Sequence, residues 1–379
     1  MKLGDVCDSV SVTFDKTKQQ VVLINTSDVL EGEVTNHILV DNKGLKGQFK
    51  KTFQKNDILY SEIRPKNRRF AYIDFDSDNY VASTKLMVIR ANNRVLPRYL
   101  YQILKSEKVI NQLQSLAESR SGTFPQITFS ELAQIDVYIP ELSEQKEIAD
   151  FLKLFDDKIE NNKKINHHLA ELIDAQFAHL LEDNELYKST FSEIGEIVGG
   201  GTPSKKVDDY WNGDIPWLSP KDLSLNPAMF TGRGQNSITE LGYKKSSAKL
   251  MPRNSILFSS RAPIGYITIA ENDISTNQGF KSIIPKPEYP YTFVYELLKQ
   301  ETPSLESSAS GSTFKEVSGT HLKNHEIRIP SHSAIIKFHE SVKPLFKTIN
   351  LNEKEIQKLI EVRDLLLPTL MSGEISVSD

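Results

Sequence analysis

The sequence predicts two globular domains of mixed α/β (α+β) class, separated and joined by two long helices in a duplicated, pseudo-two-fold arrangement. Three observations lead to this fold class. The chain repeats itself at a fixed offset, the segment after each repeat has a heptad pattern of apolar residues, and short apolar runs mix irregularly with helical patterns elsewhere. A length of 379 residues is enough for two domains with connectors.

The repeat is clearest at the end of each domain. "SGTFPQITFSELAQIDVYIP" ends at Pro140, and "GSTFKEVSGTHLKNHEIRIP" ends at Pro330. The same offset, 330 minus 140, relates further identical residues without a gap: Phe124/Phe314, Leu132/Leu322, Ile139/Ile329, Ser143/Ser333, Ile159/Ile349, Asn162/Asn352, Leu169/Leu359, Glu171/Glu361, Asp174/Asp364 and Leu180/Leu370. Earlier segments match more loosely, such as "NDILYSEIRP" with "NSILFSSRAP". A repeat of this length indicates a domain duplication, with domains at 1–140 and 185–330 and helical segments at 141–184 and 331–379.

The two helical segments share one pattern. From Ile148 to Leu180, and again from Phe338 to Leu370, mainly apolar residues recur at alternating steps of four and three. We call these the seam residues. This spacing is typical of the a and d positions of a coiled coil. We therefore expect a helix pair, with two independent surface helices as the alternative.

Four polar or helix-breaking residues refine this expectation. Ser143 is the expected N-cap of the first helix, which would be about 60 Å long if unbroken. Asn162 and Asn352 occupy equivalent seam positions, where a polar residue favours one register. Pro344 lies inside the second helical pattern and predicts a kink or a later start there.

Each domain combines short strands with a helix. In the first domain, strands are expected at 19–25, 56–63, 83–90 and 135–140, and a helix at 97–116. In the second domain, strands are expected at 214–219, 254–260, 266–271, 281–285 and 325–330, and a helix at 290–300. Because strands and helices do not alternate regularly, we expect mixed domains with twisted sheets.

Composition and charge limit the class of protein. Apolar residues make up 39% of the chain and charged residues 25%, as in ordinary globular proteins. The net charge is −4, but the acidity lies in the first helical segment; residues 1–140 carry 19 basic and 16 acidic side chains, and residues 188–330 carry 16 and 15. The sole cysteine, Cys7, excludes an internal disulfide framework. With no run of 18 apolar residues and no apolar signal core in "MKLGDVCDSV", a cytoplasmic protein without a membrane span is expected.

A glycine-rich loop, "EIVGGGTPSKK", raises the question of nucleotide binding. It matches neither G-x-x-x-x-G-K-[ST] nor G-x-G-x-x-G, and its counterpart "DVCDSVSV" in the first half has no glycines. A phosphate-binding loop at Gly199–Gly201 therefore remains only as a minor alternative. His321 and His325 lack the glutamate of a zinc-protease motif, and no nucleophile elbow occurs. We expect no catalytic residue, metal ligand or cofactor site in this chain.

Basic residues gather in both halves, as expected of a duplicated reader of DNA. Lysine and arginine contact phosphates, and arginine can also read guanine. The candidates are Lys50, Lys51, Arg64, Lys66, Arg68 and Arg69 in the first domain, and Lys205, Lys206, Lys221, Lys244, Lys245 and Arg261 in the second. Two other interpretations stay open, an ordinary solvated face and a protein–protein adaptor built on a helical rod.

The chain resembles the specificity (S) subunit of type I restriction–modification systems. "GGGTPSKKVDDYWNGDIPWLSPKDL" resembles the start of a target recognition domain of that family, and "SGSTFKEV" with "HLKNHEIRIP" resembles its end. "IPELSEQKEIADFLKLFDDKIENN" resembles the start of the family's helical region. The first domain lacks the Gly-Gly-Thr-Pro entry, and the second helical segment lacks the Glu-Gln pair.

The resemblance implies a non-catalytic subunit whose two domains each read half of a split sequence in double-stranded DNA. Antiparallel helices would set the gap and dock two adenine methyltransferase (M) subunits, with ATP-dependent restriction (R) subunits completing the complex. S-adenosylmethionine, ATP and Mg would then belong to those partners and not to this chain. A partner with fused methylase and nuclease is an alternative.

The resemblance also suggests roles for the glycine-rich loop and the basic loops. The glycines of "GGGTPSKK" become permissive turn positions. Thr202, Ser204, Lys205 and Lys206 become candidate contacts to the DNA backbone. We further expect residues 64–69, Lys221 and Arg261 to lie near DNA, so that replacing Arg68 and Arg69 with alanine weakens binding.

Overall fold

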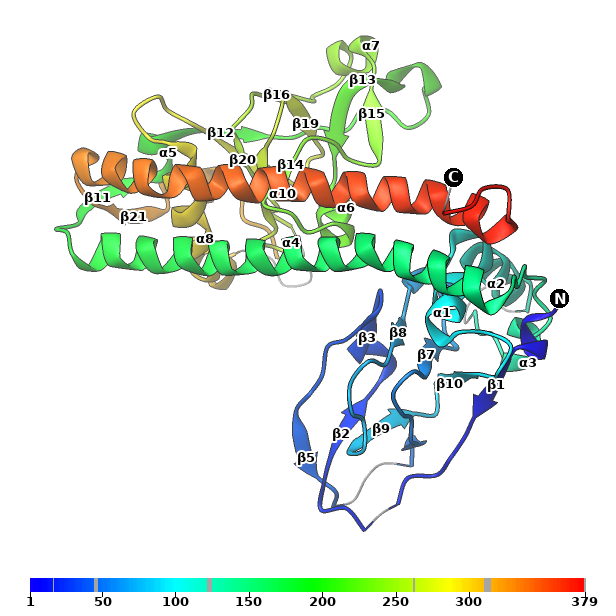
Figure 1. The fold of residues 1–379 in the computed structure, drawn as a ribbon. Coiled ribbons are helices and arrows are strands. Elements are labelled where there is room, and N and C mark those ends of the chain that lie inside the picture. The colour runs from blue at the N-terminus through cyan, green and yellow to red at the C-terminus, as the bar shows by residue number, and fades with distance from the viewer. Residues whose placement is uncertain (16, 44–46, 121–124, 262, 310–314, 378–379) are drawn as a thin grey trace. The chain divides into compact units, whose positions relative to one another are not determined.

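A computed structural model describes the chain except for residues 16, 44–46, 121–124, 262, 310–314 and 378–379 (Figure 1). The chain divides into two compact units. Unit 1 comprises Met1–Ile159 with Lys358–Asp379, and unit 2 comprises Glu160–Gln357. The two long helices, α4 (Leu142–Glu182) and α10 (His332–Ser372), each contribute residues to both units. The repeat pair Phe124/Phe314 lies outside the described residues.

Both long helices depart slightly from the expected starts. Gln145 N donates to Glu141 O at 3.0 Å, which closes the first turn of α4 earlier and leaves Ser143 inside the helix. The predicted Ser143 cap is therefore wrong. A later start of the second helix is also wrong, since α10 runs from His332 through Pro344. Val342 and Phe346 beside the proline are fully buried, and this packing stabilises the helix although one backbone donor is missing.

Within each unit the two helices pack as an antiparallel pair. In unit 2, Asn162 Nδ2 donates to Glu355 Oε2 at 2.7 Å and Asn352 Nδ2 donates to Asn166 Oδ1 at 2.8 Å. Partner numbers fall along α10 as they rise along α4, which defines the antiparallel direction. Predicted seam residues from Ile148 to Leu180 and from Phe338 to Leu370 are buried or half-buried. The predicted helix pair is confirmed over two independent surface helices.

The described residues of unit 1 form two four-stranded sheets. The first has the order β1-β10-β7-β8 and the second β5-β2-β9-β6, with β2 and β9 parallel and the other pairs antiparallel. The strands are β1 (Cys7–Val10), β2 (Gln20–Ile24), β5 (Leu39–Asp41), β6 (Phe49–Lys51), β7 (Ile58–Ser61), β8 (Phe70–Tyr72), β9 (Tyr80–Ser83) and β10 (Leu86–Ala91), beside the hairpin β3 (Val29–Leu30) and β4 (Glu33–Val34). The helices are α1 (Pro97–Lys105), α2 (Glu107–Arg120) and α3 (Phe129–Leu132), with 3-10 turns η1 (Leu3–Asp5), η2 (Thr26–Asp28) and η3 (Pro65–Asn67).

Two expectations for unit 1 are wrong. The helix expected at 97–116 is broken at Ser106, whose Oγ donates to Ile103 O at 2.7 Å and accepts from Val109 N at 3.4 Å, so it ends α1 and begins α2. The strand expected at 135–140 is reduced to a single bridge between Asp136 and Lys2. The chain turns into η1 directly after Lys2, and a longer ladder therefore has no partner there.

The described part of unit 2 has a five-stranded and a four-stranded sheet that correspond to the two sheets of unit 1, together with a two-stranded ladder. The sheet orders are β12-β20-β17-β18-β14 and β15-β13-β19-β16, and β11 pairs with β21. The strands are β11 (Tyr187–Thr190), β12 (Gly195–Gly199), β13 (Trp211–Leu218), β14 (Phe230–Thr231), β15 (Asn236–Ile238), β16 (Leu250–Met251), β17 (Ile256–Phe258), β18 (Ile267–Ala270), β19 (Ile274–Thr276), β20 (Lys281–Pro285) and β21 (Glu326–Ile329). The helices are α5 (Phe191–Ile194), α6 (Pro220–Leu225), α7 (Glu240–Lys244), α8 (Tyr291–Ser307) and α9 (Gly319–Asn324), with the 3-10 turn η4 (Asp208–Tyr210).

The strand orders confirm the duplication. In unit 1 β10 and β7 lie between β1 and β8, and in unit 2 β20 and β17 lie between β12 and β18. Both second sheets contain one parallel pair, β2 with β9 and β13 with β19. The main core of each unit also includes its part of the helix pair, with Leu152 and Leu367 buried in unit 1 and Ile173 and Val342 in unit 2. No helix within the described ranges is both long and apolar enough to cross a membrane.

Candidate nucleic-acid interface

A polar cluster lies where β7 of unit 1 ends. Ile127 N donates to Glu62 O at 2.8 Å, and Ile63 forms a bridge with Gln126, which fixes the chain after the strand. Lys85, in the turn between β9 and β10, places Nζ 3.5 Å from the Glu62 carboxylate and donates to Gln126 Oε1 at 3.2 Å. We call Glu62, Lys85 and Gln126 the unit 1 cluster.

The unit 1 cluster lines a cavity of about 450 Å³. Lys51 also lines it and donates from Nζ to Thr84 O at 3.1 Å and Leu86 O at 2.8 Å. Burial lowers the pKa of the Lys51 ammonium. The cavity is lined by Ser9, Lys51, Glu62, Lys85, Met87, Gln126, Ile127, Thr128 and Phe129. Its lining thus combines two ammonium groups, a carboxylate and an amide with the apolar side chains of Met87, Ile127 and Phe129.

Unit 2 carries the corresponding cluster after β17. Val317 N donates to Ser260 O at 2.9 Å, and Arg261 forms a bridge with Glu316. Arg261 Nε lies 3.0 Å from Glu316 Oε2, and Lys281 Nζ lies 3.5 Å from Glu316 Oε1. We call Arg261, Lys281 and Glu316 the unit 2 cluster. The backbone frame is the same in both units, whereas the side chains differ.

Three predicted residues of the first domain lie beside the unit 1 cluster. Lys51 lines the cavity, its neighbour Lys50 is exposed on β6, and Arg64 directly follows Ile63. Arg64 is exposed, has φ of 45° and donates from its backbone N to Pro125 O at 3.1 Å. Lys66 is exposed on the η3 turn. The basic loop after β7 is therefore on the surface next to the cavity.

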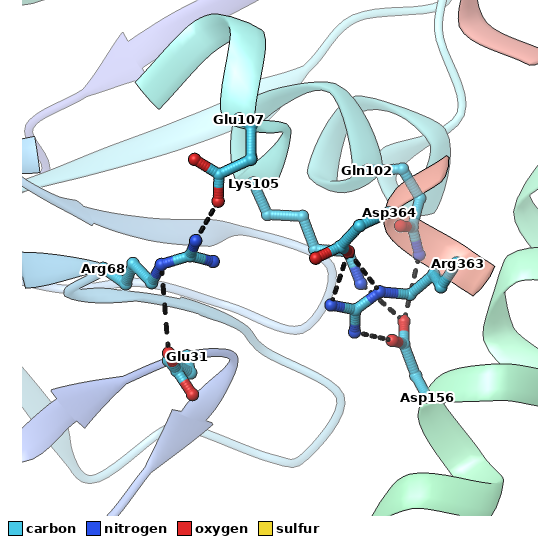
Figure 2. Close-up of polar contacts among 8 residues, drawn as sticks. All are labelled: Glu31, Arg68, Gln102, Lys105, Glu107, Asp156, Arg363 and Asp364. Carbon is cyan, nitrogen blue, oxygen red and sulfur yellow. Dashed lines mark hydrogen bonds and ion pairs between the residues drawn. The ribbon is translucent and has the colours of Figure 1, made fainter. Parts of the chain in front are cut away.

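Arg68 and Arg69 are engaged by the protein itself. The Arg68 guanidinium pairs with Glu107 of α2 and lies 4.0 Å from Glu31 (Figure 2). Arg69 Nη1 donates to Ser27 O at 3.0 Å and to Val29 O at 3.3 Å. These contacts hold the loop after β7 against its neighbours.

Three predicted residues of the second domain meet around the turn at 277–279. Thr202 Oγ1 donates to Gln278 Oε1. Gly279 lies so near Pro220, the residue before Lys221, that a Cβ there would stand 3.2 Å from the proline Cγ. The carbonyl of Gly279 accepts from Ser260 N at 2.8 Å, directly before Arg261. Thr202 and the residues next to Lys221 and Arg261 thus meet at one turn, which leads into Lys281 of the unit 2 cluster.

The glycine-rich loop is packed against backbone instead of cradling a phosphate. A Cβ at Gly200 would stand 2.0 Å from Asn277 O, and one at Gly201 would stand 2.4 Å from Ser247 C. The Gly201 amide donates to Thr276 O at 2.8 Å and the Gly200 amide to Phe280 O at 3.4 Å. Neither amide is available for an anion, and none of these glycines has positive φ. Close approach, and not turn flexibility as we expected, therefore requires glycine here.

The remaining candidates of unit 2 flank a tryptophan pair. Trp217 Nε1 donates to Gly201 O at 2.9 Å, and Trp211 Nε1 donates to Ser204 O at 3.1 Å. The two rings stack edge-to-face, with centroids 5.1 Å apart. The exposed candidates here are Ser204, Lys205 and Lys206 on the loop, and Lys244 and Lys245 at the end of α7. Lys244 pairs with Glu240 at 3.2 Å.

A buried ion cluster joins α1, α4 and α10 inside unit 1 (Figure 2). Asp156 of α4 accepts from Lys105 Nζ at 2.6 Å and from Arg363 Nη1 at 2.9 Å. Arg363 also contacts Asp364 at 2.8 Å. Burial opposes ionisation of Asp156, but the two cations outweigh it and hold the pKa of this carboxyl below its usual value. This cluster stabilises unit 1 and is separate from the basic loops.

The described residues contain no group of three His, Cys, Asp or Glu side chains arranged to hold a metal ion. His325 Nε2 instead lies 2.9 Å from Glu301 Oε2, and His321 Nε2 lies 3.1 Å from Ser308 Oγ. Sequence reasoning missed Glu62, Lys85, Gln126, Lys281 and Glu316, since none belongs to a basic run. The repeat offset that pairs Gln126 with Glu316 is the signal that could have found them.

The chain contains two copies of one mixed fold. Each copy leads into a long helix and presents its own side chains on a shared backbone frame. This arrangement defines a duplicated recognition protein. The chain belongs to the type I restriction modification DNA specificity domain family, whose model matches residues 1–171 and 184–361.

Comparison with individual proteins agrees with this family. The chain is 33% identical over 453 aligned positions to the type I restriction enzyme HindI specificity subunit of Haemophilus influenzae, with 98% of each chain covered. It is 43% identical over 171 positions to the MjaIX specificity subunit of Methanocaldococcus jannaschii, covering 45% of this chain and 39% of that relative. The solved type I restriction-modification S subunit from M. genitalium has the same fold, with a TM-score of 0.57 at 17% identity over 98% of this chain and 95% of that chain.

Proposed function

We propose that this chain is the non-catalytic DNA-recognition subunit of a type I restriction–modification complex, in which each domain reads one half of a bipartite target. The observation that carries the proposal is the repeated frame with different side chains, since Gln126 of unit 1 corresponds to Glu316 of unit 2. Two identical sites would read the same half-site twice, whereas two different sites can read two sequences. Membership in the DNA specificity domain family supports the same role.

The proposed partners are double-stranded DNA, two adenine methyltransferase subunits and ATP-dependent restriction subunits. The helix pair is the proposed docking element for the methyltransferases and sets the gap between half-sites. Its seam contains the Asn162–Glu355 and Asn166–Asn352 hydrogen bonds, which favour one register. In this proposal S-adenosylmethionine, ATP and Mg are bound by the partners, and the complex acts in the cytoplasm.

A domain exchange tests the proposal. Residues 1–140 are replaced by the corresponding domain of another family member, and methylated adenines are mapped across the genome of a host that expresses the chimera with its methyltransferase. One half of the methylated sequence should change, and the other half and the gap should stay as in the parent. A change in both halves would contradict modular reading.

Salt dependence separates a DNA reader from a protein–protein adaptor. For the assembled methyltransferase, log affinity should fall linearly with log salt as phosphate counterions are released. An adaptor would give no measurable DNA binding at low salt, and that result would sink the proposal.

A further inference from the structure

We propose that the unit 1 cluster and the unit 2 cluster read base edges and so determine the sequence of the two half-sites. This inference rests on the proposed function and adds the residues that carry specificity. None of the cluster residues except Arg261 belongs to the basic loops that the sequence singles out. Each cluster sits where the backbone is fixed by hydrogen bonds on both sides, as a selective site needs.

The first argument is the identity of the two frames. Ser61 Oγ donates to Ile63 O at 3.3 Å in unit 1, and Ser259 Oγ donates to Arg261 O at 3.2 Å in unit 2. In unit 1, Lys85 from the turn before β10 reaches Gln126. In unit 2, Lys281 at the start of β20 reaches Glu316, which corresponds to Gln126 at the repeat offset. Two domains that diverged in loop length have kept this backbone arrangement, whereas the two lysines come from different positions, since Glu62 N donates to Lys85 O and Ser260 N donates to Gly279 O.

The second argument is the difference in chemistry on that frame. A glutamine amide can pair with adenine through N6 and N7, arginine with guanine through O6 and N7, and glutamate can accept from the amino group of cytosine. The unit 1 cluster offers Glu62 and Gln126 beside one ammonium, whereas the unit 2 cluster offers Arg261 and Glu316 beside one ammonium. The two sets therefore favour different base pairs.

The third argument is access. The side chains of Lys85 and Arg261 are 47% and 49% exposed, and that of Glu316 is 34% exposed. The ion pair between Arg261 and Glu316, in which both side chains are exposed to this degree, contributes little net free energy, so these two side chains can exchange each other for base edges. Glu62 and Lys281 are less exposed, at 24% and 17%. The basic neighbours Arg64 and Lys50 in unit 1, and Lys221 in unit 2, supply the phosphate contacts that would hold a duplex over each cluster.

Isosteric exchanges test the clusters in the complete methyltransferase complex. Gln126→Glu and Glu316→Gln swap an amide and a carboxylate without changing side-chain size. The matched controls are Asp136→Asn and Glu326→Gln, whose carboxylates are exposed in the same units. Each purified complex selects binders from duplexes that are randomised one half-site at a time, and the bound fraction is sequenced.

The wild-type complex must first select a bipartite sequence; if it does not, the proposed function fails before the variants are compared. Given that sequence, Gln126→Glu should change the preference at one or more base pairs of one half-site by roughly 5- to 150-fold, and Glu316→Gln should do the same in the other half only. The controls should keep every preference within about two-fold.

Two results would overturn the inference. One is that both variants keep the base preference of the wild-type complex, within about two-fold, at every position of both half-sites. The other is an equal loss of binding to all duplexes at unchanged thermal unfolding, which would indicate a contact that carries no sequence information. Should either exchange lower the unfolding temperature by more than about 5 °C, the shortened variants Gln126→Asn and Glu316→Asp give the decisive comparison.

Discussion

Replacing Asp156 with asparagine should destabilise unit 1 far more than the same change at its neighbour Asp157. Asp156 contacts both Lys105 and Arg363, whose side chains are 9% and 16% exposed, and its own side chain is 28% exposed. Removing one member of a buried ion cluster costs about 3–5 kcal/mol when the remaining charges stay buried without a partner. Here Lys105 loses its ion pair with Asp156, whereas Arg363 keeps its contact with Asp364. The partial exposure of Asp156 places the expected loss at about 2–3 kcal/mol.

Asp157→Asn is the matched control. Asp157 pairs with Lys153 one turn away on the exposed side of α4, and its side chain is 52% exposed. Such a pair contributes about 0.3–0.5 kcal/mol. For a unit of this size 1 kcal/mol corresponds to about 2–4 °C in unfolding temperature. Asp156→Asn should therefore lower it by about 5–10 °C and Asp157→Asn by less than about 2 °C.

Circular dichroism with tryptophan fluorescence distinguishes the units. Both tryptophans of the chain, Trp211 and Trp217, lie in unit 2. In Asp156→Asn, the loss of stability should therefore appear as a circular dichroism transition of unit 1 at a lower temperature than the fluorescence transition of unit 2. Because the folded pKa of Asp156 is lowered, its contribution is complete at neutral pH and disappears as pH falls below the usual aspartate range. Equal losses in the two variants, or a difference that does not shrink as pH falls below the usual aspartate range, would refute the reasoning.

Three further predictions concern unit 2 and the basic loops. Gly201→Ala should lower the free energy of unfolding by about 1–3 kcal/mol, because a methyl group would stand 2.4 Å from a backbone carbon. Gly199→Ala, whose nearest atom would be at 4.0 Å, should lower it by less than about 0.5 kcal/mol. Urea unfolding followed by tryptophan fluorescence measures both. Burial raises the pKa of Glu296 to about 8, so folding takes up a proton between about pH 4.5 and 8 and stability falls as pH rises. Glu296→Gln should remove this loss and so gain about 3–4 kcal/mol relative to wild type on going from pH 5 to pH 8. A stability difference that stays constant with pH would contradict this prediction. Lys66→Gln should reduce the slope of log affinity against log salt by about 0.9, whereas Arg69→Gln, whose guanidinium donates to backbone carbonyls, should leave the slope unchanged in filter-binding titrations.

The sequence predicts the parts of the fold that depend on periodic apolar burial. The heptad seam identified both helices, because residues such as Leu152 and Val342 must be buried wherever the partner lies. Local sequence patterns did not predict the structure correctly where contacts with a distant segment of the chain determine it. The strand expected at 135–140 is reduced to one bridge since the chain turns away after Lys2, and Ser106 splits one helical pattern into two helices.

The candidate interface was predictable only in outline. Runs of lysine and arginine mark the loop after β7, but charge patterns do not show which guanidinium groups contact protein, and Arg68 and Arg69 do. Lys85 and Gln126 are isolated in the sequence and meet because the turn before β10 and the bridge between Gln126 and Ile63 both lie at the end of β7. Sequence spacing alone contains no such contact.

The division of unit 1 has a consequence for the order of events during synthesis. Its core includes Leu367 and Leu370, and its ion cluster includes Arg363, although the rest of the unit ends at Ile159. A ribosome adds about 5–20 residues per second, so roughly 10–40 s pass between the emergence of Ile159 and that of Arg363. Throughout this interval the first recognition domain has α4 without α10 and exposes apolar surface, while unit 2, complete at Gln357, can fold first. In this chain the domain that is made first is the last to be finished.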